Sequence, residues 1–374
     1  MKMLYLSTWD FANEHSDGVC KKIKSQIKVF EANGFQVDFI CIRNNEVVYK
    51  EDGKERILAH VGSIKKTPAY MKIYPYLKDK QYDWIYNRYG MMDTFYYRVL
   101  RRLHHNGARI LIEIPTYPYA GEKPQGIAYQ LMYWWDEVYL GKLKKLTDRI
   151  LTYSQDEVIW DIPTIRIMNG IDLAEIPPAV KTEKKDDTIH LLAVALMQPY
   201  HGYERLLYGL KKYYDEGGSR KVLCHFVGDG PEKTAYERIV SEENLNDHVI
   251  FYGRKGGREL DEIYHKCDLG ICILGGYKTN RFWVSDLKSK EYLAKGIPII
   301  CGVDTDVFRV IDRAYYLQFA NDDSYLDVSR IINFYDEIYQ KNDGQTVANE
   351  IRKMAEKHIS IETTMEPVRE YMLL

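Results

Sequence analysis

Two ionisable residues, Lys288 and Glu291, stand three positions apart in the segment 285–301, which has the pattern of a helix followed by a buried strand. Residues at that spacing are neighbours on one helical face. A helix N-terminus offers unpaired N–H groups and a positive dipole end, which suit a phosphate. Lys288 would add charge there, and Glu291 would accept hydrogen bonds from a sugar hydroxyl. The segment therefore suits a nucleotide-sugar site, and a surface helix carrying an ion pair is the alternative.

Three further turns follow expected strands and carry groups that suit a phosphate or a base. Gly228 and Gly230 come first, and glycine lets a ligand approach the backbone closely. Arg254 lies in a glycine-rich turn after the next strand, and His201 stands where an expected helix begins. Each pattern is short, so a plain turn is the alternative in every case.

The segment 113–119 ends a strand in the first half of the chain and continues into a proline-rich loop. Proline fixes the backbone, and Thr116, Tyr117 and Tyr119 would project from this loop. A rigid loop that packs aromatic rings is the alternative. We expect Thr116, Tyr117 and Tyr119 to lie near the mouth of a cleft.

Metal-binding patterns are scarce. Asp304 and Asp306 resemble the Asp-x-Asp that holds a metal in metal-dependent sugar transferases, but three-residue patterns arise easily by chance. No group of histidines, cysteines and aspartates has zinc spacing, and the phosphate-binding G-x-x-x-x-G-K-[ST] sequence does not occur. We therefore expect no metal and no cofactor.

Composition narrows the class of protein. The chain has 374 residues, 45% of them hydrophobic, which suits two domains. Its net charge of −2 argues against a nucleic-acid partner. The six cysteines are scattered without a C-x-x-C pair, as in a reduced cytosolic protein. No apolar run reaches the roughly 18 residues needed to cross a bilayer. We expect a cytoplasmic protein, with peripheral attachment to the inner face of the cell membrane as an option.

Alternating strands and helices position these residues. The alternation runs through the first half of the chain, stops at 173–188 and then restarts. Residues 173–188 are polar, charged and proline-bearing, which is typical of a linker. The pattern predicts an α/β protein with two doubly wound, Rossmann-like domains that face a cleft, at 1–172 and 189–358. A C-terminal helix at 359–374 is expected to cross back to the first domain.

Two segments of the first domain mix basic and aromatic residues, which suits an anionic membrane surface. One is the helix around Trp134 and Trp135, followed by Lys142, Lys144 and Lys145. The other segment, residues 64–80, interleaves apolar and aromatic residues with Lys65, Lys66, Lys72, Lys78 and Lys80. For both segments, the alternative is a charged face that is exposed to water.

Taken in order, these motifs resemble those of GT-B-fold retaining glycosyltransferases of family four, over nearly the whole chain. The similarity is greatest to the bacterial enzymes of capsule, exopolysaccharide or O-antigen assembly. The segments that carry it are Gly18-Val19, Glu113 to Tyr119, Asn169-Gly-Ile-Asp172, His201 to Arg205, Val227 to Pro231 and Leu287 to Pro298.

The resemblance implies that Glu291 binds the donor ribose and that Ser285, Leu287 and Lys288 hold the diphosphate. The family's first glutamate would fall at Trp283. Its Arg and Lys clamp on the diphosphate would fall at Leu196 and His201, so Lys288 or Arg281 would compensate. The histidine common in the first domain is replaced by Pro115-Thr116. On this basis the expected catalytic residues are Lys288, His201 and Thr116. The expected donor-binding residues are Glu291, Ser285, Leu287, Arg281, Gly228, Gly230, Arg254 and Gly18. The expected acceptor-side residues are Tyr117, Tyr119 and Glu122.

The expected activity is metal-independent, retaining transfer of a sugar from a nucleoside-diphosphate-sugar to a lipid-linked or other saccharide acceptor. A nucleotide-sugar epimerase is one alternative, although no acid/base constellation is evident. A GT-B subunit that binds nucleotide without turnover is the other, favoured by Trp283 and Leu196. The sequence specifies neither the sugar, the base, the acceptor nor the linkage.

Overall fold

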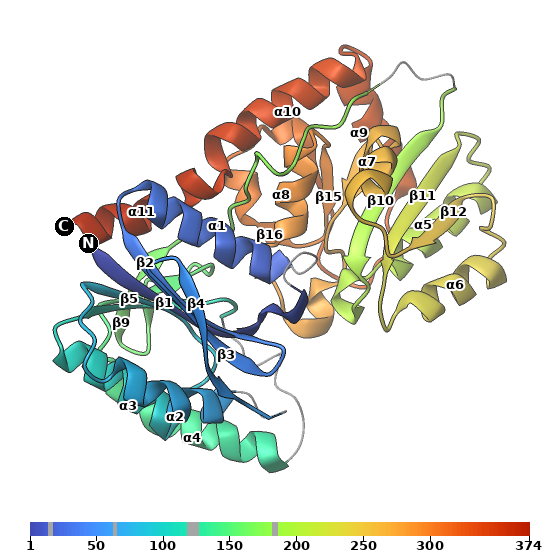
Figure 1. The fold of residues 1–374 in the computed structure, drawn as a ribbon. Helices are drawn as coiled ribbons and strands as arrows, with labels where there is room; N and C mark the ends of the chain where they lie inside the picture. The colour runs from blue at the N-terminus through green and yellow to red at the C-terminus, as the bar shows by residue number, and fades with distance from the viewer. Residues whose placement is uncertain (14–17, 63–65, 118–126, 182–185) are drawn as a thin grey trace. The chain divides into compact units, whose positions relative to one another are not determined.

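The computed structural model describes residues 1–13, 18–62, 66–117, 127–181 and 186–374 (Figure 1). The chain forms two compact units. Unit 1 comprises Met1–Met168 and Thr364–Leu374, and unit 2 comprises Asn169–Thr363. The segment 173–188 therefore belongs to unit 2. Both units have a predominantly parallel sheet, which confirms the predicted α/β fold class.

Unit 1 contains a nine-stranded sheet in the order β4-β3-β2-β1-β5-β6-β7-β9-β8. The central strands are parallel, and β1 lies between β2 and β5. Their buried apolar side chains, such as Leu4, Ile85 and Ile112, form the core. The strands are β1 (Lys2–Asp10), β2 (Gln36–Arg43), β3 (Glu46–Glu51), β4 (Lys54–His60), β5 (Trp84–Arg88), β6 (Arg109–Ile114), β7 (Arg149–Thr152), β8 (Val158–Ile159) and β9 (Ile162–Arg166).

Helices cover both faces of this sheet. Figure 1 shows α1 and α11 on one face and α2, α3 and α4 on the other. The C-terminal helix packs against unit 1, where the ring of Tyr371 lies 5.9 Å from that of Trp84 and Met365 contacts Gln26. The helices are α1 (Gly18–Ala32), α2 (Lys66–Leu77), α3 (Thr94–His105), α4 (Ile127–Leu143) and α11 (Ile361–Leu373).

The antiparallel strands β3 and β4 extend the edge of this sheet, and sequence analysis missed them. Asp52 and Gly53 join them with φ values of 50° and 76°. An Asp-Gly pair with both residues left-handed is a common two-residue hairpin turn. That dipeptide is the sequence signal that predicts the hairpin.

Unit 2 contains a six-stranded parallel sheet in the order β12-β11-β10-β13-β15-β17. Numbered along the chain, this is the 3-2-1-4-5-6 order of dinucleotide-binding folds. The strands are β10 (Ile189–Leu196), β11 (Val222–Asp229), β12 (Val249–Gly253), β13 (Leu269–Ile271), β15 (Ile299–Cys301) and β17 (Tyr316–Gln318), and a separate short pair is β14 (Trp283–Val284) with β16 (Asp304–Thr305).

The helices of unit 2 connect these strands. Gly296 ends α8 with a φ of +77°, and a Cβ there would lie 2.4 Å from the carbonyl oxygen of Ala348 in α10. The predicted helix stop at Gly296 is thus confirmed, and β15 follows. The helices are α5 (Glu204–Asp215), α6 (Lys233–Glu242), α7 (Gly257–Lys266), α8 (Leu287–Ala294), α9 (Val328–Tyr339) and α10 (Gly344–His358).

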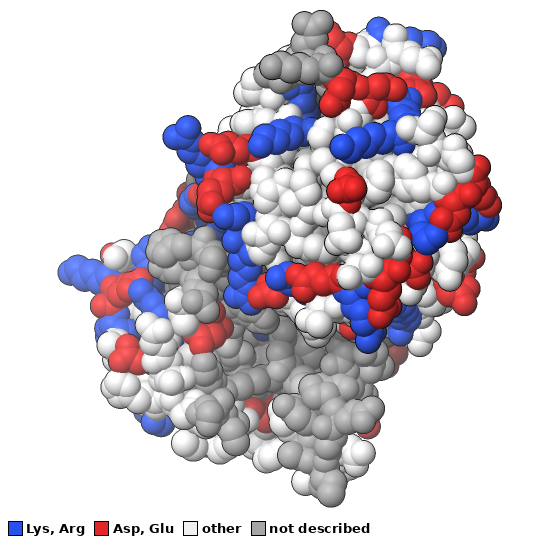
Figure 2. Space-filling view, turned by 90° about the vertical axis from the view of Figure 1, so that its right-hand side faces the viewer, with Lys and Arg blue, Asp and Glu red and all other residues white. Residues whose placement is uncertain are grey.

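Charge is mixed on the surface. On the face shown in Figure 2, the basic and acidic side chains of the described residues are interspersed, and a mostly uncharged region contains one acidic side chain. This distribution agrees with the formal net charge of −2.

Candidate functional site

The candidate donor site of unit 2 lies between β10 and β13, where the sheet changes its direction of winding. In open α/β sheets, ligands bind outside the carboxyl ends of the strands at such a point. The turns that follow these two strands are bonded to each other. The N–H of Leu274 donates to the carbonyl of His201 at 2.9 Å, and that of Gly275 donates to the carbonyl of Tyr200 at 3.1 Å.

A pair of glycines makes this contact possible. Gly202 has a φ of +63°, and a Cβ on it would lie 2.5 Å from the amide nitrogen of Gly275. No side chain fits at either position without moving backbone. The close approach fixes His201, the residue before Gly202, at the switch point.

His201 is buried, and its imidazole ring is held by a backbone hydrogen bond. Its Nδ1 accepts a hydrogen bond from the backbone N–H of Gln198 at 2.9 Å. Burial first, and then the positive charge of Lys288, lower the pKa of His201 to about 2. The ring is therefore neutral near neutral pH, so His201 can contribute a hydrogen bond but no positive charge to a bound phosphate. Its Nε2–H has no hydrogen-bond partner among the described residues and can donate one bond.

Two cations lie near His201. The ammonium of Lys288 donates to the phenol of Tyr203 at 2.8 Å, and burial lowers the pKa of Lys288 to about 8. The guanidinium of Arg281 lies over the ring of Tyr200, 4.0 Å from its centre. The rings of Tyr200 and Tyr203 lie 4.6 Å and 5.4 Å from the ring of His201, so the two cations that contact these tyrosines lie near His201. Together they offer two positive charges and one neutral N–H donor to an anion.

The N-terminus of α8 is capped by the protein itself. The carboxylate of Asp286 accepts hydrogen bonds from the N–H of Ser289 at 2.9 Å and from its hydroxyl at 3.0 Å. This cap occupies the N–H of Ser289, which is one of the N–H groups expected to be free for a phosphate. Leu287 is the first residue of α8 and is half-buried. The positive charge that would bind a phosphate must come mainly from Lys288 and Arg281.

Ser285 also makes hydrogen bonds within unit 2. Its hydroxyl oxygen accepts from the backbone N–H of Asn169 at 2.9 Å and from the ammonium of Lys290 at 3.2 Å. The side-chain amide of Asn169 donates to the carbonyl of Ser285. Sequence analysis named the Asn169 motif but did not predict this tie, which holds the start of unit 2 to the loop before α8.

Glu291 is half-buried on α8, one turn after Lys288. Its negative charge raises the pKa of Lys288 and so opposes the effect of burial. The two residues thus lie near each other, as their spacing predicted.

The glycines at the end of β11, Gly228 within it and Gly230 after it, have a structural explanation. A Cβ on Gly228 would lie 1.9 Å from the carbonyl oxygen of Ala195, and one on Gly230 would lie 2.5 Å from the amide nitrogen of Met197. Both glycines are therefore required by the close pairing with the end of β10, whether or not a ligand binds. Arg254 is exposed, with its Nε 3.6 Å from a carboxylate oxygen of Asp229.

The predicted residues of unit 1 are only partly described. Gly18 begins α1 and is exposed, and Thr116 is exposed after β6. Tyr117 is half-buried, and its ring meets that of Trp160 edge-on at 6.4 Å. This contact matches the alternative of a loop that packs aromatic rings. Tyr119 and Glu122 lie outside the described residues.

A buried polar cluster in unit 1 was missed by sequence analysis. Lys22 and Arg88 both bond the fully buried carboxylate of Glu113. The missed signal is on α1, where Lys22 and Gln26 stand at an i,i+4 spacing on the face that is otherwise apolar. Charged residues are almost never fully buried unless they are paired.

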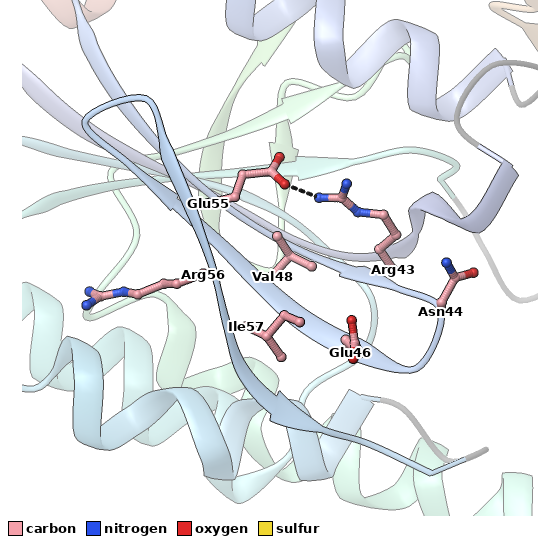
Figure 3. Close-up of a pocket in the computed structure, with 7 residues that line it drawn as sticks. All are labelled: Arg43, Asn44, Glu46, Val48, Glu55, Arg56 and Ile57. Atoms are coloured by element: carbon pink, nitrogen blue, oxygen red, sulfur yellow. Dashed lines mark hydrogen bonds and ion pairs between the residues drawn. The ribbon is translucent and has the colours of Figure 1, made fainter.

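A shallow hollow of about 360 Å³ lies elsewhere in unit 1, on the β2–β4 edge (Figure 3). Arg43 and Glu55 pair across it at 2.7 Å, and Arg56 pairs with Glu51 at 2.9 Å. Its basic side chains thus already have acidic partners, and it holds none of the predicted site residues.

Comparison with known proteins finds a family match in the part of unit 2 that contains His201. Residues 179–274 match the family described as Glycosyl transferases group 1. No curated protein sequence matches the chain.

Three solved structures share the fold over the full chain length. Sucrose-phosphate synthase from Thermosynechococcus elongatus has a TM-score of 0.68 at 16% identity, covering 100% of this chain and 99% of its own. HepE from Anabaena, in complex with UDP, has a TM-score of 0.65 at 14% identity, covering 100% of both chains. The lipopolysaccharide outer core galactosyltransferase WaaB has a TM-score of 0.61 at 12% identity, covering 100% of this chain and 99% of its own. The family match and the fold together support a glycosyltransferase of the GT-B superfamily.

The expected departures from the family pattern lie at Trp283 and Leu196. Trp283 lies in β14, and the guanidinium of Arg309 stacks on its ring at 4.5 Å. Leu196 ends β10 with 58% of its surface exposed. Neither side chain carries a charge, so neither replaces the glutamate or the cation that the resemblance implies.

The two aspartates of the Asp-x-Asp pattern are paired with cations. Asp304 pairs with Arg309, and Asp306 pairs with the fully buried Lys290. Within the described ranges, no cluster of three or more histidine, cysteine or acidic side chains could hold a metal ion. In the same ranges, no helix is both long and apolar enough to cross a membrane.

Proposed function

We propose that this chain is a retaining glycosyltransferase that moves a sugar from a nucleoside-diphosphate-sugar to a lipid-linked saccharide in bacterial surface-polysaccharide assembly. The observation that carries the proposal is the convergence of Lys288, Arg281 and His201 at the switch point of unit 2. These groups lie in or beside the region that matches a glycosyltransferase family.

The arrangement suits the stabilisation of a departing diphosphate. Negative charge develops on the phosphate oxygen as the glycosidic bond breaks, and donors fixed in advance stabilise it at little cost of reorganisation. Lys288 supplies a charge held by Tyr203, and His201 supplies a neutral N–H held by Gln198. Catalysis would rest on this stabilisation and on positioning. We assign no general base and no metal to the reaction.

Glu291 is proposed to bind the ribose of the donor. A carboxylate accepts two hydrogen bonds from neighbouring hydroxyls, and its position one turn after Lys288 places it beside the proposed diphosphate site. HepE was solved with UDP, so uridine nucleotides are the first donors to test.

Unit 1 is proposed to bind the acceptor and to attach to the anionic inner surface of the membrane through α4. This helix exposes Leu131, Trp134 and Val138 by 61%, 64% and 43%, and Met132 and Trp135 are also exposed. Tryptophan favours the membrane interface. Two of the lysines of 64–80 suit the membrane less well than expected, because Lys80 pairs with Glu51 and Lys72 bonds the carbonyl of His60. Lys65 lies outside the described residues.

The test is a thermal-shift panel of UDP, GDP, dTDP and their sugars, followed by transfer from the best donor to a lipid-linked acceptor. Stabilisation by one nucleotide family, with transfer that gives the same anomeric configuration, would support the proposal. Transfer with inversion would contradict the retaining mechanism.

A second candidate is a GT-B subunit that binds nucleotide without turnover. The uncharged side chains of Trp283 and Leu196 favour it, because they remove two polar groups that the resemblance implies. Tight nucleotide binding without donor hydrolysis or transfer would select this alternative.

A further inference from the structure

A cluster of buried polar side chains lies on the α1 side of unit 1, near the carboxyl ends of its parallel strands. It draws on α1, β5, β6 and the residue after β7. All of its members are at most 8% exposed. They are Lys22, Gln26, Tyr86, Arg88, Glu113 and Tyr153.

Glu113 is the centre of this cluster, and its hydrogen-bonding capacity is occupied. One carboxylate oxygen accepts from Lys22 at 3.0 Å and from Arg88 at 2.5 Å. The other accepts from Tyr86 at 2.5 Å and from Gln26 at 3.1 Å. Burial opposes ionisation, but the charges of Lys22 and Arg88 outweigh it and lower the pKa of Glu113 to about 2. Glu113 is therefore a fixed anion that orients two cations and is unsuited to act as a general base.

Arg88 uses only part of its guanidinium in this cluster. Its Nη1 bonds Glu113, and within the described part of the chain its other nitrogens have no hydrogen-bond partner. The side chain of Arg88 is 8% exposed, so a small part of it is accessible to solvent. A purely structural arginine would be expected to pair bidentately with the carboxylate, whereas here the second oxygen of Glu113 is taken by Tyr86 and Gln26.

The position of Arg88 suits a ligand. Arg88 is the last residue of β5, and β5 pairs with β1. From β1 the chain passes to β2 on one side and later to β5 on the other, so this is the switch point of the unit 1 sheet. Ligands of open α/β sheets bind at this place. An arginine fork matches the geometry of phosphate and carboxylate groups.

We propose that Arg88 binds an anionic group of the acceptor substrate, a phosphate or a carboxylate, and that Glu113 is the positioning residue that holds its guanidinium. The identity of the occupant as the acceptor rests on the proposed function. The anion site itself rests on the geometry of unit 1. A lipid diphosphate and an acidic sugar share the required chemistry.

Isothermal titration of the full chain with inorganic pyrophosphate and, separately, with glucuronate tests the proposal. The best-binding nucleoside diphosphate is present at saturation, so that the donor site is filled. Wild type should bind one of the two anions, and Arg88→Gln should weaken that binding about tenfold to hundredfold. Pyrophosphate binding would indicate a lipid diphosphate, and glucuronate binding an acidic saccharide.

Arg101→Gln is the matched control, because Arg101 is exposed on α3. It should bind the anion like wild type, and both variants should keep wild-type nucleotide affinity. Unchanged anion affinity in Arg88→Gln, or binding of neither anion by wild type, would overturn the proposal. If Arg88→Gln does not fold, Arg88→Lys keeps a charge beside Glu113 but loses the fork. A several-fold loss there supports the site, and wild-type affinity overturns it.

The proposed function and the anion site at Arg88 can each be contradicted without the other. If no nucleotide binds, the proposed function fails, and the anion titration is repeated without nucleotide. A difference between wild type and Arg88→Gln would then still establish the anion site, and equal affinities would overturn it.

Discussion

The ammonium of Lys288 and the phenol of Tyr203 are joined by a hydrogen bond of 2.8 Å between α8 and the residue that precedes α5. Burial raises the pKa of Tyr203 well above its usual value, so this phenol is a neutral partner. It orients the ammonium without cancelling its charge. Lys288, with a pKa of about 8, is therefore charged at neutral pH and available to an anion.

The first prediction concerns pH. Lys288 is protonated below pH 8 and neutral above it, so affinity for UDP should fall as the pH rises through about 8. The affinity of Lys288→Arg for UDP should not fall as the pH rises through about 8, because arginine stays charged. Lys288→Ala should weaken binding at neutral pH by roughly 1.5–3 kcal/mol. Calorimetry across the range measures all three, with uridine as the control that lacks phosphate. A flat profile for UDP in wild type would contradict the assignment.

The second prediction concerns His201, which is neutral in the folded protein down to pH about 2. An unfolded histidine takes up a proton below about pH 6.5. The unfolded state then binds more protons than the folded state, so stability falls as the pH falls. The slope is about 1.4 kcal/mol per pH unit for this one group. His201→Gln should lose that part of the slope between about pH 5.5 and about pH 4.5.

Urea unfolding at both pH values measures this difference. His60→Gln is the matched control, because it makes the same substitution at an exposed position. The rate of sugar transfer by wild type should not fall at acid pH through protonation of His201. Equal slopes for wild type and His201→Gln would mean that this imidazole titrates normally.

The third prediction concerns Glu291. Glu291→Ala should weaken nucleoside-diphosphate binding by roughly 1.5–3 kcal/mol, because a charged acceptor for ribose hydroxyls is lost. Glu291 is half-buried rather than in the core, so the fold should persist. Glu262→Ala, an exposed glutamate on α7, is the control and should bind like wild type. A 2′,3′-dideoxy nucleotide should bind wild type and Glu291→Ala equally. If Glu291→Ala binds UDP as tightly as wild type, the ribose role is excluded.

The fourth prediction concerns α4. Full burial of a large apolar side chain contributes roughly 1.5–3 kcal/mol, so the double variant Leu131→Ser with Trp134→Ser should lose most binding to anionic vesicles. The control is Lys72→Ser with Lys78→Ser, which should lose less, at about 1 kcal/mol per lysine. Co-sedimentation at low and high salt measures both. A larger loss from the lysine pair would return the contact to residues 64–80.

The sequence was sufficient to predict the strand and helix order around the donor site. Apolar runs specified strands such as β10 and β11, and Gly296 with Pro298 specified the end of α8. These are local signals, in which neighbouring residues determine the backbone. The hairpin at Asp52 and Gly53 had an equally local signal that was overlooked.

Charge states and tertiary roles could not be predicted in this way. The neutral state of His201 depends on burial and on Lys288, 87 residues away along the chain. Gly228 and Gly230 resemble a ligand turn in sequence, but the atoms nearest to them belong to β10 and the residue that follows it. The polar network around Glu113 brings together four separate segments. Such groups meet only in the folded chain, so spacing along the sequence contains little information about them.

The most direct test of the account is transfer of a labelled sugar from the best-binding nucleoside-diphosphate-sugar to a lipid-linked acceptor, with EDTA present, by wild type and Lys288→Ala. The account predicts transfer by wild type that EDTA does not reduce. It also predicts a loss of about tenfold to hundredfold in Lys288→Ala with the fold intact. Wild-type activity that EDTA abolishes and manganese restores, or undiminished transfer by Lys288→Ala, would contradict it.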